Sequence, residues 1–126
     1  MKTLFIGDIV GRKARNFAIE KIRELKEVKH FDLIIVNVEN SAGGFGVTPE
    51  ICDQFLLNGA DVLTSGNHIW DKKEIIAYIN ETNKLLRPMN MVEGTPGLGI
   101  TIIDTSFGKI GVATVSYTHL RAHETR

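Results

Sequence analysis

Apolar residues along this chain occur both in short continuous runs and in longer segments with polar residues interspersed. Three short runs, at residues 2–7, 32–38 and 61–64, are bounded by glycine or polar residues and predict buried β-strands. Residues 16–28 place apolar side chains at helical spacing between charged ones and predict an amphipathic helix. Residues 71–80 predict a further helix. The chain is therefore expected to alternate strands with helices.

A helix between the second and third strands is predicted by the signals at its two ends. Thr48 suits the N-cap, Pro49 suits the first turn, and the acidic Glu50 favours the same end. Asn58 and Gly59 together form a typical C-terminal stop.

The last third of the chain predicts antiparallel structure. Residues 94–99 predict a turn-rich loop, and residues 100–104 and 109–114 predict a β-hairpin joined through residues 106–108. The full order β-α-β-α-β-α-β-β predicts an α/β fold. Its continuous apolar strands predict a parallel sheet flanked by helices and covered on both faces.

Composition narrows the class of protein. The 126 residues suffice for one domain, and a formal net charge of zero gives no global field to attract nucleic acid or an anionic membrane. The single cysteine, Cys52, cannot form an internal disulfide, which favours a reducing cytoplasm. No apolar run approaches the roughly 20 residues of a membrane span, and the run at residues 4–6 is too short for a signal peptide.

Polar residues follow each of the three predicted parallel strands. Asp8 follows the first strand, Glu39 and Asn40 the second, and Asn67 and His68 the third. Open α/β sheets bind ligands beyond the carboxyl ends of their strands, so these five residues are expected at one edge. Their convergence predicts a functional site there.

Each of these residues also has an ordinary structural explanation when taken alone. Asp8 would suit a turn or a helix N-cap, Glu39 a solvated loop, and His68 a structural contact. Together, however, a carboxylate able to bridge two cations, amide oxygens and an imidazole favour a metal site.

Five segments resemble the YmdB-like family of calcineurin-type metallophosphoesterases. These segments are GDIVG at 7–11, VEN at 38–40, GNHIWDKKE at 66–74, RP at 87–88 and EGTPG at 93–97, and the similarity runs from Met1 to about Thr114. The resemblance implies a metallophosphoesterase-type sandwich and a metal-dependent phosphodiesterase, of the 2',3'-cyclic-nucleotide 2'-phosphodiesterase type. The implied substrate is a small phosphodiester, such as a cyclic nucleotide or an RNA-derived cyclic phosphate.

The resemblance also implies roles for the five residues. Asp8 would bind the first of two metal ions, Glu39 would bridge both, and Asn67 would bind the second. Asn40 would complete the metal site at its edge, and His68 would be the catalytic proton donor or would orient the phosphate. Iron or manganese is implied, with zinc as an alternative. A homo-oligomer is compatible with the sequence.

The chain departs from the family toward its C-terminus. Family members carry three further ligands, all histidines, in a C-terminal half, and this chain stops before them. Residues 1–114 are expected to form the N-terminal half of the domain. Residues 115–126 resemble a translated sequencing adapter, and we expect them to be a non-native tail. His119 and His123 in that tail are four apart, but a polar terminal segment explains them better than a metal site.

Two other functional classes stay open. The chain could be a non-catalytic α/β module that binds a nucleotide or a partner, or a fragment without a function of its own. Measuring bound metal would distinguish the non-catalytic binding module from a metal-dependent enzyme. The glycine-rich residues 43–46 could cradle phosphate, but they lack the lysine of a P-loop.

Overall fold

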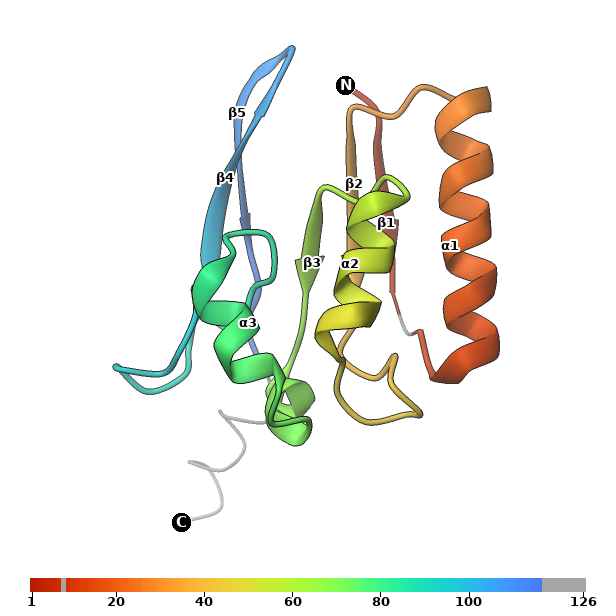
Figure 1. Cartoon of the computed structure of the whole chain (residues 1–126). Helices are drawn as coiled ribbons and strands as arrows, with labels where there is room; N and C mark the ends of the chain where they lie inside the picture. The colour runs from red at the N-terminus through yellow and green to blue at the C-terminus, as the bar shows by residue number, and fades with distance from the viewer. Residues whose placement is uncertain (8, 117–126) are drawn as a thin grey trace.

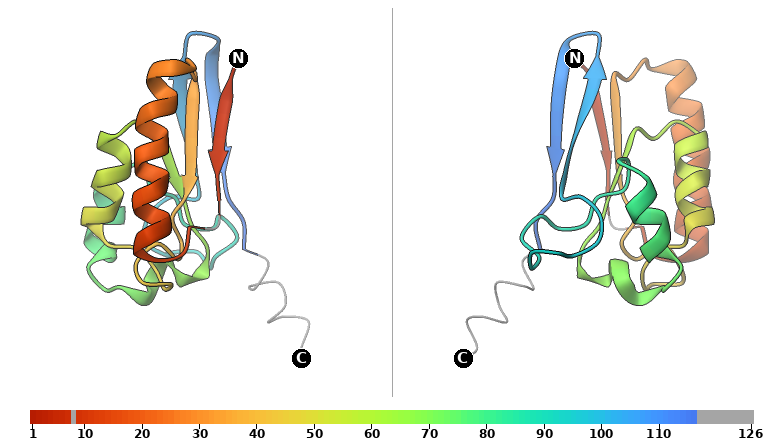
Figure 2. Two further views of the ribbon diagram at one scale, coloured as in Figure 1. Left: turned by 90° about the vertical axis from the view of Figure 1, so that its right-hand side faces the viewer. Right: turned by 60° about the vertical axis from the view of Figure 1, so that its left-hand side comes forward.

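Three layers make up the fold, with a parallel β-sheet between a helical layer and a β-hairpin (Figure 1, Figure 2). The computed structural model describes residues 1–7 and 9–116. The sheet has the order β1-β2-β3, formed by β1 (Thr3–Ile6), β2 (Leu33–Asn37) and β3 (Val62–Thr64). Both strand pairs are parallel, so the prediction of a parallel sheet is confirmed.

The helical layer covers one face of the sheet. It consists of α1 (Gly11–Val28), α2 (Pro49–Leu57) and α3 (Ile75–Glu81). Alternate residues of β2, Ile34 and Val36, belong to the same buried cluster as Ile22 of α1 and Phe55 of α2. The helices thus cover the side chains that β2 directs to this face.

A β-hairpin covers the other face of the sheet. Its strands β4 (Ile100–Thr105) and β5 (Gly108–Ala113) are antiparallel. Leu33 and Ile35, the other alternate residues of β2, cluster with Val112 of β5. Strand β2 is therefore covered on both faces as predicted, although the second face is covered by the hairpin. Strand β1 is not, because Phe5 is 61% exposed, so the prediction that residues 2–7 form a buried strand is wrong.

A connection between the sheet and the hairpin was not apparent from the sequence. Leu85 forms a parallel bridge with Leu63 of β3, and Leu86 forms another with Leu98 in the loop before β4. Both leucines at 85 and 86 are fully buried. A two-residue segment has no periodicity to reveal it, so only the folded chain shows that it extends the sheet.

Two helix boundaries differ from the prediction. Helix α1 begins at Gly11, five residues before the predicted start. The prediction missed residues 11–15 because they are mostly polar and carry no apolar periodicity. The helix predicted over 71–80 begins only at Ile75 as α3, and the 3₁₀ helix η1 (Asn67–Asp71) precedes it. Lys72 has an extended backbone, with φ −110° and ψ 116°, which separates the two.

The predicted signals at the start of α2 are confirmed. Thr48 caps the helix because its Oγ1 accepts the Ile51 N–H at 3.3 Å, and Pro49 occupies the first turn. Among the helices of the described residues, none combines the length and the apolar character needed to cross a bilayer. The proposed tail is described only at Val115 and Ser116; His119 and His123 lie outside the described residues.

Candidate metal and phosphate site

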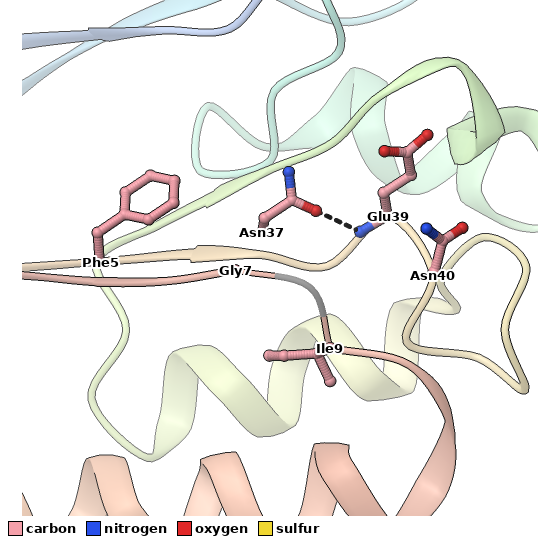
Figure 3. A pocket seen from close by; sticks show the side chains of 6 residues that line it. All are labelled: Phe5, Gly7, Ile9, Asn37, Glu39 and Asn40. Carbon is pink, nitrogen blue, oxygen red and sulfur yellow. Dashed lines mark hydrogen bonds between the residues drawn. The ribbon is translucent and has the colours of Figure 1, made fainter.

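A cavity of about 380 Å³ lies at the carboxyl ends of β1 and β2 (Figure 3). Its lining comes from both strands and from the segments that follow them: Phe5, Gly7, Ile9, Asn37, Glu39 and Asn40. The parallel pairing of β1 with β2 causes this arrangement, because both strands end at the same edge. The cavity thus lies where the sequence predicted a site.

Asp8, the first predicted metal ligand, lies outside the described residues. Its two neighbours in sequence, Gly7 and Ile9, both line the cavity. The segment after β1 also contacts the segment after β2, since the Gly11 N–H donates to the Asn40 carbonyl at 3.4 Å. The chain on either side of Asp8 is thus close to Glu39 and Asn40.

Glu39 is held at both its backbone and its carboxylate. Its N–H donates to Asn37 Oδ1 at 3.1 Å, and its Oε2 accepts the His68 N–H at 3.1 Å. The three ion pairs found among residues 1–7 and 9–116 do not include Glu39. A half-buried carboxylate without a cationic side chain is a suitable ligand for a metal ion, because the ion would offset its desolvation.

Gly66 makes room for the Glu39 carboxylate. A Cβ placed on Gly66 would collide with both carboxylate oxygens and with their carbon. The backbone φ at Gly66 is −128°, which any residue adopts, so the demand for glycine at this position is steric. The loop after β3 therefore carries a glycine because the acidic side chain after β2 occupies the adjacent space.

The 3₁₀ helix η1 presents Asn67 and His68 at the same edge. Ile69 is fully buried and anchors η1 in the core, whereas Asn67 is exposed and the His68 side chain keeps 44% of its surface accessible. His68 Nδ1 lies 3.0 Å from Asp71 Oδ2. Because a carboxylate only accepts hydrogen bonds, Nδ1 is the donor, and Nε2 makes no hydrogen bond within residues 1–7 and 9–116.

The donor set fits a transition-metal ion. Glu39 supplies a carboxylate, Asn40 and Asn67 supply amide oxygens, and Asp8 adds a second carboxylate to the predicted set. Such oxygen donors suit manganese, whereas imidazole ligands favour iron or zinc. The structure brings Glu39, Asn40, Asn67 and His68 to one edge, while their metal-binding and catalytic roles stay predictions.

Two residues of this region were not singled out from the sequence. Asn37 orients the Glu39 backbone, and Asp71 pairs with His68. Asn37 could have been noticed as a polar residue inside an otherwise apolar strand. Asp71 lies within the GNHIWDKKE segment at 66–74, but the prediction of a helix from residue 71 gave no indication that it pairs with His68.

Cys52 and His30 lie away from this edge of the sheet. Cys52 is fully buried in α2, and burial raises the pKa of its thiol, which disfavours the reactive thiolate. His30 is exposed between α1 and β2.

Comparison with known proteins identifies relatives of this chain. The sequence model of the family described as "YmdB-like protein" matches residues 4–123. The 2',3'-cyclic-nucleotide 2'-phosphodiesterase of Bacillus subtilis (strain 168) is 43% identical over 112 residues, which are 89% of this chain and 42% of that protein. The chain thus spans less than half the length of this relative.

Solved structures resemble the fold closely. A hypothetical protein from Thermus thermophilus has a TM-score of 0.84 and 30% identity, with 91% of this chain and 44% of that chain covered. A structure titled as a novel phosphatase from Mycoplasma pneumoniae has a TM-score of 0.80 and 25% identity, with 98% and 50% covered. The described fold therefore corresponds to about half of each of these structures.

Proposed function

Because the chain belongs to the YmdB-like protein family, we propose that it supplies the first half of a metal-dependent phosphodiesterase site. The activity is proposed for the full-length gene product, with residues 1–114 contributing the Glu39 and His68 edge of the sheet. The chain's coverage of only 42% of the Bacillus subtilis enzyme is the reason for assigning the activity to a longer protein.

One observation carries this proposal. Glu39 Oε2 accepts the His68 N–H at 3.1 Å, although the two residues are 29 positions apart in sequence. The contact brings a carboxylate beside an accessible imidazole at the carboxyl edge of the sheet. A candidate ligand and a candidate proton donor are thereby adjacent, as hydrolysis of a phosphodiester requires.

Each residue would have a distinct role in the reaction. Asp8, Glu39, Asn40 and Asn67 would hold two ions, iron or manganese with zinc as the alternative. Bound ions would neutralise phosphate charge and acidify a water molecule. With both ring nitrogens protonated, His68 would give its Nε2 proton to the leaving oxygen, and Asp71 would keep the ring oriented by accepting the Nδ1–H.

The substrate class follows from the relative's name. A 2',3'-cyclic nucleotide, free or at the end of RNA, is the proposed substrate, and cleavage at the 2' oxygen would leave a 3'-phosphate. A reducing cytoplasm is the proposed location, since the single cysteine of this chain cannot form an internal disulfide.

The test is hydrolysis by the purified full-length gene product. Adenosine 2',3'-cyclic phosphate is incubated with manganese or iron, and the position of the product phosphate is determined by NMR. Formation of the 3'-phosphate, and its loss on chelation, would support the proposal. Tight binding of the nucleotide without turnover at any metal concentration would instead favour a non-catalytic binding module.

The 126-residue chain gives a second test. It should bind metal weakly and lack significant activity, because the predicted ligands in it are too few for two transition-metal ions. Turnover of a chromogenic phosphodiester per molecule is compared with that of the full-length gene product. Comparable values would contradict the idea that the chain is only half of a site.

A further inference from the structure

Phe45 is an exposed aromatic side chain beside His68. Its ring centroid lies 6.2 Å from that of His68, with 64° between the ring planes, an edge-to-face arrangement. Sixty-two per cent of Phe45 is accessible to solvent. An aromatic face is therefore available next to the proposed proton donor, on the segment that directly follows Glu39 and Asn40.

The loop that carries Phe45 is fixed by its own hydrogen bonds. The Gly44 N–H donates to the Asn40 carbonyl at 3.2 Å, and the Ala42 N–H donates to the Gly46 carbonyl at 3.0 Å. Gly46 has φ +71° and packs so closely on η1 that an added Cβ would lie 3.1 Å from the His68 carbonyl. This packing holds the two segments together, so the Phe45 ring is positioned relative to His68.

The chemistry of a 2',3'-cyclic nucleotide connects the two side chains. The proposed leaving oxygen is bonded to C2' of the ribose, and C2' is bonded to C1', which carries the base. A histidine that protonates this oxygen is therefore only a few bonds from the base. The Phe45 ring, centred 6.2 Å from the His68 ring, is within the span of one nucleoside.

We propose that Phe45 is a stacking platform for the base of the substrate. The inference rests on the proposed function and adds a source of substrate specificity to it. Stacking on a side chain tolerates different bases, because every base offers a π-face. Phe45 would thus distinguish nucleotides from phosphodiesters without a base, with little preference among bases.

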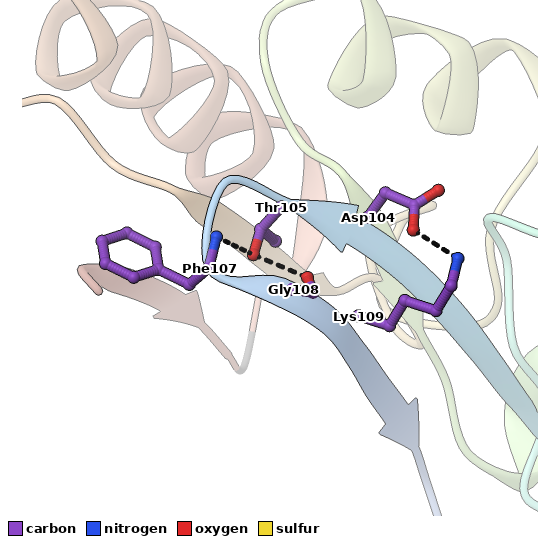
Figure 4. A network of polar contacts seen from close by, with 5 residues as sticks. All are labelled: Asp104, Thr105, Phe107, Gly108 and Lys109. Carbon is purple, nitrogen blue, oxygen red and sulfur yellow. Dashed lines mark hydrogen bonds and ion pairs between the residues drawn. The ribbon is translucent and has the colours of Figure 1, made fainter.

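Phe107 provides a matched control. It lies in the turn of the β4–β5 hairpin and is 64% exposed, close to the 62% of Phe45 (Figure 4). Its N–H donates to Thr105 Oγ1 at 3.1 Å, within its own turn. Replacing either ring removes the same exposed apolar group, but only Phe45 adjoins His68.

The experiment compares two substrates in the full-length gene product. Adenosine 2',3'-cyclic phosphate carries a base, and methyl ribofuranoside 2',3'-cyclic phosphate carries the same cyclic phosphate without one. Phe45→Ala, Phe45→Trp and Phe107→Ala are assayed on both compounds, with manganese present. Thermal denaturation of each variant shows whether the fold is retained.

Phe45→Ala should raise KM for the adenosine compound about tenfold, within the usual range for the loss of one stacked ring. The kcat should stay within about twofold, since stacking stabilises the ground state and transition state alike. Kinetics on the methyl riboside should be unchanged. Phe45→Trp should restore the low KM, and Phe107→Ala should match the wild type on both compounds.

Two results would overturn the inference in distinguishable ways. If the wild type hydrolyses both compounds and Phe45→Ala weakens both equally, or lowers the Tm, the ring has a packing role and the stacking proposal alone fails. If the wild type hydrolyses neither compound, the proposed function fails and the stacking role fails with it.

Discussion

The carboxyl edge of the parallel sheet and the β4–β5 hairpin both contain paired polar groups, but the pairs arise at very different sequence separations. Glu39 and His68 meet across 29 residues, through a carboxylate and a backbone N–H in a partly buried setting. Asp104 and Lys109 meet across five residues in an ion pair whose side chains are 80% and 74% exposed (Figure 4).

This difference shows which polar contacts indicate function. The hairpin pair needs only the antiparallel register of neighbouring strands, and water screens it. The sheet-edge contact requires two parallel strands and the connection between them to be in place. The half-buried Glu39 carboxylate at this edge loses part of its hydration, and a bound cation would offset that cost.

The largest expected effect comes from Glu39→Ala in the full-length gene product. Loss of the proposed bridging carboxylate should remove bound metal and reduce activity by more than about 100-fold, beyond the 10–100-fold typical of outer-shell partners. Metal content and phosphodiester hydrolysis are measured together. Asp104→Ala, which removes an exposed carboxylate from the hairpin, should alter neither. Full metal occupancy in Glu39→Ala would exclude the bridging role.

Next in size is His68→Ala. Turnover should fall by about 10²–10⁴, the usual loss for a general acid, while the metal stays bound. His30→Ala is the control, because His30 is exposed and precedes the amino end of β2, whereas Glu39 follows its carboxyl end. If metal is lost together with turnover, His68 acts as a ligand and its assignment as the proton donor is wrong.

Gly66→Ala tests the packing under the site and can be made in the 126-residue chain. The new methyl group would collide with the Glu39 carboxylate, so the free energy of unfolding should fall by about 1–3 kcal/mol. Gly111→Ala in β5 is the matched control, since its Cβ would lie an ordinary 3.7 Å from Ile102. Urea denaturation of both variants measures the difference. Equal stabilities would show that Glu39 moves aside freely.

The smallest effect is expected at the hairpin pair. Asp104→Ala should change the free energy of unfolding by no more than about 0.5 kcal/mol, because both partners are largely exposed. Thr48→Ala sets the scale, since loss of the N-cap of α2 should cost about 1 kcal/mol. A larger loss at Asp104 than at Thr48 would mean that the hairpin ion pair matters more than its exposure indicates.

The sequence alone determined the strands, their parallel order and the ends of α2. A strand that is covered on both faces has a continuous run of apolar residues, as β2 does, and this run predicted the strand. Thr48 and Pro49 identify the start of α2 through local chemistry. The rule that parallel strands end at one edge was sufficient to predict where Glu39, Asn40, Asn67 and His68 would gather.

The tertiary structure decided what depends on contacts between distant segments. The break at Lys72, the pairing of Asp71 with His68 and the bridges of Leu85 and Leu86 have no periodic signal in the sequence. The place of Phe45 beside His68 likewise follows from the packing of Gly46 on η1. Short-range patterns specify elements, whereas the geometry of a site is set by which loops the sheet brings into contact.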